Sequence, residues 1–168
     1  MKSLFLLRHA KSNSFQTDLS DMDRELTDGG RRAAQLVGSY IGSQRLWPDL
    51  ILSSPAVRAR ETTELVLASA NAHIEVEYDQ QVYEATPQIL FGILERVEKE
   101  REALLLVGHN PGLEELLRML TGRAEIMSTS SLAKISLDIS DWSQCDVSKG
   151  TFDWILTPSE RSKPILKY

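Results

Sequence analysis

The sequence predicts an α/β domain of three layers, with a mostly parallel central sheet, helices on both faces and an antiparallel hairpin near the C-terminus. Three apolar runs of strand length, residues 4–7, 50–52 and 104–107, are each followed by turn residues and then by a helical pattern. Strands that alternate with helices favour parallel pairing. The chain has 168 residues, of which 42% are hydrophobic, and this size suits a single domain over residues 1–168.

The first two helices are expected directly after local start signals. The first should begin near Thr27, because apolar residues at helical spacing follow it, and it should end before Pro48. After the strand at 50–52, Ser54 has the chemistry of an N-cap and Pro55 that of the first helical position. The second helix is therefore predicted to start there.

Two further helices carry the same pair of a cap and a proline. Residues 74–78 alternate as a half-exposed strand would, and Thr86-Pro87 then predicts the start of the third helix. After the strand at 104–107, Asn110-Pro111 predicts the start of the fourth helix, which Gly122 closes.

The C-terminal third is expected to differ from the rest. Residues 132–139 and 151–156 resemble strands with no helix between them, so they should pair as an antiparallel hairpin. Residues 158–168 are expected to form a surface tail.

The composition argues against several classes of protein. A net charge of -5 and a pI of about 5.3 leave no basic stripe for a nucleic acid, so any phosphate recognition should be local. The single cysteine, Cys145, allows no internal disulfide and no thiolate metal cluster. Only four apolar residues precede Arg8, which is too few for a signal-peptide core or a membrane span. We therefore expect a cytoplasmic protein that binds neither membrane nor nucleic acid.

The three predicted parallel strands end in groups that suit an oxyanion. The first ends in Arg8-His9, the second leads to Arg58 in the first turn of a helix, and the third ends in Gly108-His109-Asn110. Functional groups of an open parallel sheet gather beyond the carboxyl ends of its strands. Guanidinium groups match phosphate oxygens, and the free N–H groups at a helix start favour negative charge.

Arg58 breaks a local rule, because the helix dipole favours an acidic residue over a cation in the first turn. A bound anion would make this cation a ligand, whereas Arg60 beside it is expected to be solvated. The arginines would also repel a divalent cation, which disfavours a metal site built from His9 and His109. His73 is expected in a surface turn.

Four segments resemble motifs of the histidine phosphatase superfamily, the phosphoglycerate-mutase-like proteins. Residues 7–12 (Leu-Arg-His-Ala-Lys-Ser), 53–59 (Ser-Ser-Pro-Ala-Val-Arg-Ala) and 107–112 (Val-Gly-His-Asn-Pro-Gly) are similar to its three motifs. The Arg-His-Ala form, the short chain and residues 23–30 (Asp-Arg-Glu-Leu-Thr-Asp-Gly-Gly) resemble its small SixA-type phosphohistidine phosphatase branch. The likeness spans most of the chain, and three ordered motifs are a specific signal.

This resemblance implies a phosphoglycerate-mutase-like fold and a phosphatase without a metal or other cofactor. It implies that His9 is the nucleophile and becomes phosphorylated, while Arg8, Arg58 and His109 hold the phosphoryl oxygens. Arg24 matches an arginine of the SixA-like loop, where it either reaches the substrate phosphate or is an exposed residue of an acidic loop. The physical chemistry agrees, because nearby arginines disfavour imidazolium and so lower the pKa of His9.

The proton donor for the leaving group is not assigned by the motifs. Larger members of the superfamily carry a carboxylic acid on an inserted segment, for which this chain has no room. Glu84, which precedes a predicted helix, is either that acid or an exposed loop residue, and the second interpretation is preferred. Lys11, Ser12 and Asn110 are expected at the rim, although Asn110 is also explained as a helix cap. A site without an acid favours a substrate with a good leaving group, and phosphohistidine is one.

Three hypotheses of function follow. The first is a metal-independent phosphatase that acts on phosphohistidine of a protein, such as a histidine-containing phosphotransfer domain. The second is a small-molecule phosphomonoesterase of the same superfamily, with Glu84 as its general acid. The third is a noncatalytic module that binds phosphoproteins, and the presence of Arg8, His9, Arg58 and His109 argues against it.

Overall fold

The computed structural model describes residues 1–14, 18–159 and 162–168. The strands are β1 (Lys2–Arg8), β2 (Leu50–Ser53), β3 (Val76–Tyr78), β4 (Ala103–Gly108), β5 (Leu132–Leu137), β6 (Gly150–Ser159) and β7 (Ser162–Lys167). The helices are α1 (Asp28–Gln44), α2 (Val57–Ala70), α3 (Pro87–Leu94) and α4 (Gly112–Thr121), and the short 3-10 helices are η1 (Asp21–Asp23), η2 (Gln80–Val82) and η3 (Trp142–Gln144).

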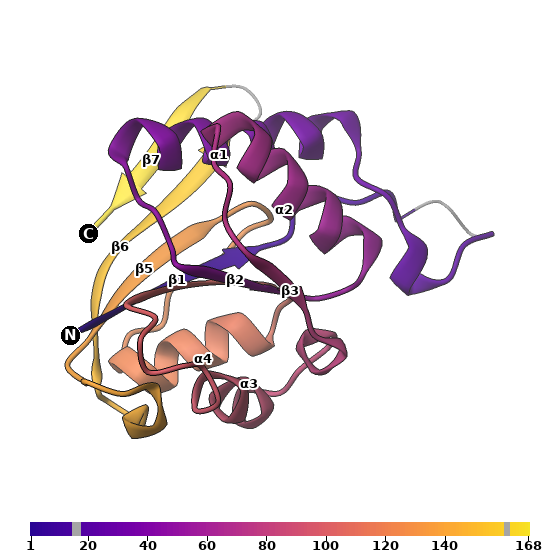
Figure 1. The fold of residues 1–168 in the computed structure, drawn as a ribbon. Helices are drawn as coiled ribbons and strands as arrows, with labels where there is room; N and C mark the ends of the chain where they lie inside the picture. The colour runs from indigo at the N-terminus through magenta and orange to yellow at the C-terminus, as the bar shows by residue number, and fades with distance from the viewer. Residues whose placement is uncertain (15–17, 160–161) are drawn as a thin grey trace.

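The predicted three-layer α/β architecture is confirmed. The seven-stranded sheet has the order β3-β2-β4-β1-β5-β6-β7, in which β3, β2, β4 and β1 are parallel to one another and the pairs β1-β5, β5-β6 and β6-β7 are antiparallel. Figure 1 shows α1 and α2 on one face of the sheet and α3 and α4 on the other. A sheet covered on both faces explains why the parallel strands are continuous apolar runs.

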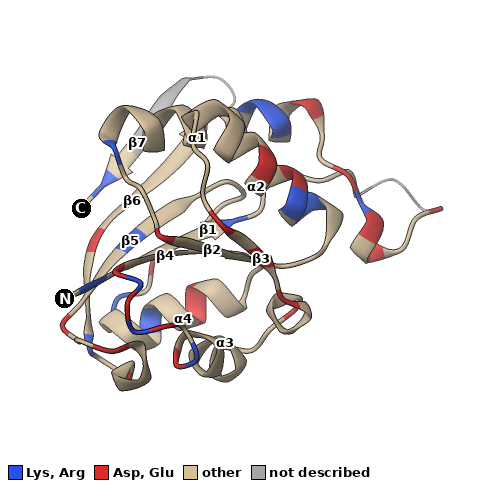
Figure 2. Ribbon diagram, viewed as in Figure 1, with Lys and Arg blue, Asp and Glu red and all other residues tan. Residues whose placement is uncertain are grey.

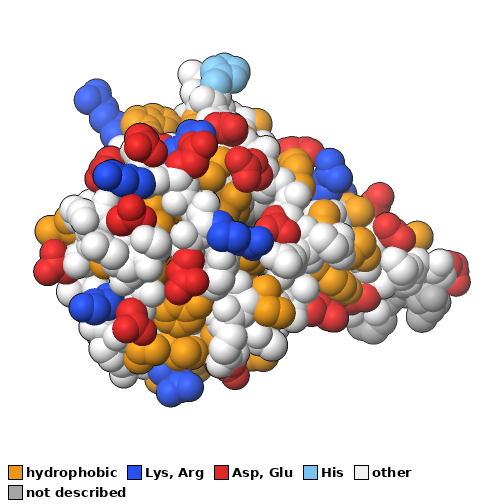
Figure 3. All heavy atoms as spheres, turned by 60° about the horizontal axis from the view of Figure 1, so that its bottom comes forward, with side chains coloured by type: hydrophobic (Ala, Val, Ile, Leu, Met, Phe, Trp, Pro, Cys, Tyr) orange, Lys and Arg blue, Asp and Glu red, His pale blue; other side chains and the backbone are white. Residues whose placement is uncertain are grey.

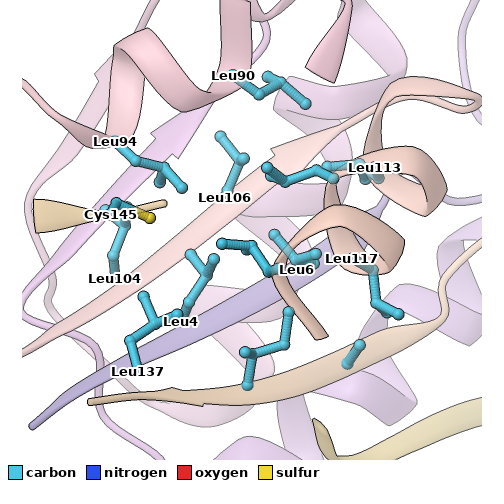
Figure 4. Packing of buried hydrophobic residues seen from close by; sticks show 14 of the residues in the cluster. Leu4, Leu6, Leu90, Leu94, Leu104, Leu106, Leu113, Leu117, Leu137 and Cys145 are labelled. Atoms are coloured by element: carbon cyan, nitrogen blue, oxygen red, sulfur yellow. The ribbon is translucent and has the colours of Figure 1, made fainter. Parts of the chain in front are cut away.

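The core consists of two apolar layers, one on each face of the sheet. Successive residues of a strand point into opposite layers. Leu4 and Leu6 of β1 pack with the leucines of α3 and α4, and Figure 4 shows this cluster from close by. Phe5 and Leu7 point to the opposite face and pack with residues of α1 and α2. This alternation is the two-residue period of a strand, and it holds β1 rigidly so that the residues after it are well positioned.

Local start and stop signals predicted several helix ends correctly. Thr27 caps α1, with its side chain accepting a hydrogen bond from the N–H of Gly30. Thr86 caps α3 in the same way, and Gly122 ends α4 in the left-handed conformation that glycine adopts without strain. In each case the signal and the partner lie within a few residues.

Two predicted helix starts are wrong by about one turn or less, for one shared reason. The helix α2 begins at Val57 with Ala56 as its N-cap, not at Ser54-Pro55, and the Ser54 hydroxyl instead bonds a histidine ring that is distant in sequence. The helix α4 begins at Gly112, and Pro111 takes the cap position predicted for Asn110. Both side chains bond groups that are distant in sequence, and Ser54 Oγ also accepts from the N–H of Ala56 near the start of α2.

The prediction of a surface tail over residues 158–168 is also wrong. Ser162–Lys167 forms β7, which extends the hairpin of β5 and β6 into three antiparallel strands and places Leu166 beside Leu156 in register. Residues 160–161 lie outside the described residues. Pro164 makes the segment look unlike a strand, yet proline is tolerated in an edge strand, where not every N–H is needed for pairing.

The surface matches the mixed charge of the sequence. Figure 3 shows acidic and basic side chains interspersed on the face that carries α3 and α4. Across the described residues, none of the helices has both the length and the apolar character that crossing a membrane requires.

Candidate active site

The predicted site residues meet at the carboxyl edge of the sheet. The strands β2, β4 and β1 are neighbours, with Ser53 beside Val107 and Arg8 beside Gly108 in register. Figure 2 shows basic residues near the start of α2 and charged residues between β1 and α1 at the same end of the sheet. A hollow of about 450 Å³ lies there. Its lining includes every site or rim residue predicted from the sequence, namely Arg8, His9, Lys11, Ser12, Arg24, Arg58, Glu84, His109 and Asn110.

His9 directly follows β1 and is 9% exposed. Its Nδ1 lies 2.7 Å from the carbonyl oxygen of Ala10. Because a carbonyl oxygen only accepts, we assign a proton to Nδ1, which leaves Nε2 with a free lone pair. The Ala10 peptide is held in turn, since its N–H donates to Thr62 Oγ1 at 2.9 Å and that hydroxyl donates to the Arg58 carbonyl oxygen at 2.6 Å. The ring therefore has the unprotonated nitrogen that a nucleophile requires.

Burial is the main reason why the two histidines of the hollow are neutral. The pKa of His9 is lowered to about 4, mainly by burial. The hydrogen bond between Nδ1 and the Ala10 carbonyl raises this pKa, whereas repulsion from Arg58, Arg8 and Arg24 lowers it. The pKa of His109 is lowered to about 3, first by burial and then by repulsion from His9 and Arg58. Arginine repulsion, the cause expected from the sequence, is thus the smaller contribution at His9.

His109 follows β4, and its ring centroid lies 5.0 Å from that of His9. Its Nε2 is 2.8 Å from Ser54 Oγ, which also accepts a hydrogen bond from the N–H of Ala56. We assign the Ser54 hydroxyl as the donor to Nε2, and the ring proton to Nδ1. This buried Nδ1 has no hydrogen-bond partner among the described residues.

Arg58 and Arg8 each have a buried N–H donor that, like Nδ1 of His109, lacks a hydrogen-bond partner among the described residues. Arg58 is 4% exposed, and its Nη1 and Nη2 donate to the main-chain oxygen and to Oδ2 of Asp21, at 2.6 and 2.9 Å. Arg8 donates from Nη1 to the carbonyl oxygen of Met127 at 2.9 Å. The buried Nε of each arginine has no partner within the described part of the chain. Buried donors are almost always satisfied, so these two N–H groups and Nδ1 of His109 indicate an anion site.

Arg8 is held through a network based on α4. The Met127 carbonyl that accepts from Arg8 also accepts from Asn110 Nδ2 at 3.0 Å. Glu114 Oε1 accepts from the same Asn110 nitrogen and from the N–H of Met127, both at 2.8 Å. This network is what takes Asn110 away from the expected cap position, and it places the side chain at the rim of the hollow.

Arg24 reaches the hollow, where an acidic residue holds it. Its Nε and Nη2 donate to Asp21 Oδ1 at 3.0 and 2.7 Å, and its Nη1 donates to Ser12 Oγ at 3.1 Å. The Tyr83 hydroxyl donates to Asp21 Oδ2 at 2.7 Å. Asp21 and Tyr83 were not predicted from the sequence as residues of this site, and neither were Ser14 and Thr129 of the lining. The spacing of Asp21 and Arg24 could have suggested an ion pair, whereas no local signal marks Tyr83.

Two of the three motifs lie inside the range that a family model matches, and the third follows it. The family model of the histidine phosphatase superfamily (branch 1) matches residues 4–102, which is more than half of the chain. The chain belongs to the histidine phosphatase superfamily. The matched range includes Arg8, His9 and Arg58, and His109 follows shortly after it. The enzyme class of the chain is accordingly that of a phosphatase.

Individual relatives point to the SixA-type branch. An uncharacterised chloroplastic protein of Arabidopsis thaliana is 30% identical, over 92% of this chain and 75% of its own. The phosphohistidine phosphatase SixA of Escherichia coli (strain K12) is 28% identical, over 92% of this chain and 93% of its own. The crystal structure of a proposed phosphohistidine phosphatase SixA from Agrobacterium tumefaciens has a TM-score of 0.81 and 28% identity, and the match covers 94% of this chain and 98% of that one. The predicted likeness to SixA-type members is confirmed.

Glu84 of this histidine phosphatase lies in the same hollow and is exposed. Its φ of 50° is in the left-handed region, which a residue other than glycine adopts at a cost. Gly112 lets the start of α4 approach this segment closely, because a Cβ there would collide with the carbonyl oxygen of Ala85. The segment around Glu84 is thus held against α4, beside His109.

The low pKa values of His9 and His109 predict that the protein loses stability in acid. Both folded values lie below the value of about 6.5 for an unfolded histidine. The unfolded chain therefore binds protons that the folded chain does not, and the free energy of unfolding should fall as the pH is lowered from about 6.5 through about 4. Urea unfolding across this range measures the effect.

Proton NMR provides a direct check of the same prediction. The imidazole signals of His9 and His109, assigned with His9→Ala and His109→Ala variants, should not titrate between about pH 7 and pH 5. A titration of either ring centred near pH 6.5 would contradict the prediction.

Proposed function

We propose that this histidine phosphatase hydrolyses phosphohistidine on a protein, through a phosphorylated intermediate on His9 and without a metal ion. The observation that carries the proposal is the neutral His9 ring in one hollow with buried N–H donors of Arg8, Arg58 and His109 that have no partner among the described residues. A free ring nitrogen and unsatisfied donors are the two requirements of phosphoryl transfer to an enzyme histidine.

The two chemical steps use these groups in turn. In the first, Nε2 of His9 attacks the phosphorus, the new P–N bond forms, and the bond to the leaving group breaks. In the second, the oxygen of a water molecule attacks the phosphorus and the P–N bond to Nε2 of His9 breaks. The protons of the water leave with the phosphate, and the neutral ring is restored. Charge on the equatorial oxygens is stabilised throughout by Arg8, Arg58 and the Nδ1–H of His109, a contribution that Mg²⁺ makes in many other phosphoryl-transfer enzymes.

The leaving group supports phosphohistidine as the substrate. Imidazole departs more easily than an alkoxide, so its departure depends less on a strong general acid. The hollow is open, with Glu84 and Lys11 exposed in its lining, which allows a protein side chain to enter. The relative from Escherichia coli is named a phosphohistidine phosphatase. As the partner we propose a histidine-containing phosphotransfer domain, which is the partner expected from the sequence.

The experiment is a substrate panel with and without EDTA. Phosphate release from a ³²P-labelled histidine-containing phosphotransfer domain should exceed release from sugar phosphates, nucleotides and aryl phosphates at matched concentrations. EDTA should leave the rate unchanged. Loss of activity with EDTA would refute the metal independence, and a preference for sugar phosphates or nucleotides would refute the protein substrate. Within the described residues no group of three or more His, Cys, Asp or Glu side chains could hold a metal ion.

A second candidate is a small-molecule phosphomonoesterase, and the position of Glu84 in the hollow favours it. If Glu84 protonates the leaving group, Glu84→Gln should lower kcat for alkyl phosphates by about 10²-fold while aryl phosphates, whose leaving groups need little protonation, change little. Glu115→Gln is a matched control, because Glu115 is an exposed acid that lines a neighbouring hollow shared with Glu84. An unchanged rate for alkyl phosphates in Glu84→Gln would show that Glu84 is not the acid.

A further inference from the structure

Asp21 connects three parts of the active site through one side chain. It lies in η1, between β1 and α1. Its Oδ1 accepts from Nε and Nη2 of Arg24, and its Oδ2 accepts from Nη2 of Arg58 and from the hydroxyl of Tyr83. The main-chain oxygen of Asp21 accepts a further hydrogen bond from Nη1 of Arg58. The loop, the first turn of α2 and the segment before α3 therefore meet at this carboxylate.

The hydrogen bonds of Asp21 exclude a role in proton transfer near neutral pH. An ionised carboxylate has about four acceptor positions, and here each oxygen receives two donors. The hydrogen bond from Tyr83, together with those from Arg24 and Arg58, lowers the pKa of Asp21 to about 2. A carboxylate that stays ionised and fully occupied is neither a general acid nor a free base.

Asp21 accepts hydrogen bonds from only some of the N–H groups of Arg58. Asp21 takes one N–H from each terminal nitrogen of Arg58, whereas the buried Nε has no partner among the described residues. A guanidinium has five N–H donors, so the remaining ones are available to a phosphoryl oxygen. Arg8 is held in the same manner, by Nη1 on Met127, with its Nε also without a partner in the described chain. A phosphoryl group can thus bind without displacing Asp21.

We propose that Asp21 is a positioning residue, which orients Arg58 and Arg24 toward the phosphoryl group, and that Tyr83 supports it. The inference rests on the proposed function, because the arginines act on the substrate and Asp21 acts only through them. Arg58 is 4% exposed while Asp21 is 44% exposed, so the carboxylate anchors an otherwise buried cation from the solvent side.

The direction in which phosphate affinity changes when Asp21 is neutralised distinguishes a positioning role from a purely electrostatic one. Asp21 has the same charge sign as phosphate, so if it acted only through its charge, or competed with phosphate for Arg58, its neutralisation would strengthen phosphate binding. If it positions the arginines, its neutralisation should weaken phosphate binding in spite of the lost repulsion. Calorimetric titration of the resting protein with inorganic phosphate and with vanadate gives this sign without any turnover.

Three variants make the test specific. In Asp21→Asn, the dissociation constants for phosphate and vanadate should rise by about tenfold or more, and kcat should fall on the order of 10- to 100-fold, because misplaced groups lose much of their effect. Tyr83→Phe, which removes one of the four hydrogen bonds, should give a smaller change in the same direction. Asp23→Asn is the matched control, since the Asp23 carboxylate is two residues away and accepts from Ser20 Oγ.

Failure of the positioning role can be distinguished from failure of the proposed function. Phosphate binding that is unchanged or tighter in Asp21→Asn would overturn the positioning role, and so would an equal loss in Asp23→Asn. Circular dichroism and Tm establish that each variant is folded, and the exposed position of Asp21 makes this measurement practicable. If the wild-type protein binds phosphate but releases none from any substrate, the proposed function fails while the titration still tests Asp21.

Discussion

Replacing His9 with alanine should lower phosphate release by about 10³-fold or more, because the variant lacks the nitrogen that forms the covalent intermediate. The ring is buried, neutral and held by the Ala10 carbonyl, and alanine has no group in place of its Nε2. The measurement is release of ³²P from phosphohistidine under single-turnover conditions. Rapid acid-free quenching should also trap ³²P on the wild-type protein and none on His9→Ala.

The matched control is His73→Ala, which removes an exposed histidine outside the hollow. It should keep full activity and labelling. Wild-type activity in His9→Ala would contradict His9 as the nucleophile. A wild-type protein that binds phosphoprotein but becomes neither labelled nor active would support the noncatalytic module instead.

Replacing Arg58 with alanine should lower kcat by about 10²- to 10³-fold, with a smaller change in KM, because a preorganised donor acts mainly on charge that develops in the transition state. Arg58 is nearly fully buried in the first turn of α2, where the helix dipole disfavours a cation without an anion nearby. Steady-state kinetics with the phosphorylated domain and an aryl phosphate measure both constants.

Two companion variants separate charge from geometry. Arg58→Lys keeps the charge but loses Nε and the planar fork, so it should restore little activity. Arg60→Ala removes the neighbouring exposed arginine, whose Cζ lies 4.4 Å from the centroid of the Tyr78 ring. This variant should change kcat little. Full activity of Arg58→Lys would contradict the role of Nε, and equal losses in Arg58→Ala and Arg60→Ala would indicate a nonspecific charge effect.

The fold was predictable where the physical cause is local. The apolar runs at β1, β2 and β4 are buried on both faces, and such strands have a distinctive pattern. Thr27, Thr86 and Gly122 satisfy backbone groups within a few residues, so their patterns were reliable. The short edge strand β7 was missed because its stabilisation comes from pairing with β6.

The site was predictable to the extent that it lies at strand ends. Arg8, His9 and His109 directly follow β1 and β4 or end them, and parallel order alone places such residues together. Ser54 and Asn110 were predicted as N-caps but precede the observed caps, Ala56 and Pro111, and each bonds a group far away in sequence. No local pattern contains that information.

Asp21 and Tyr83 illustrate the remaining limit most clearly. Periodicity, composition and motif order were sufficient for the α/β class and for the meeting of Arg8, His9 and His109 at one edge of the sheet, because these depend on burial and on the ends of neighbouring strands. The partners of Arg58, the protonated nitrogen of His9 and the dominance of burial in its low pKa depend on three-dimensional packing. Such contacts join segments that are tens of residues apart, and only the tertiary structure brings them within hydrogen-bond distance.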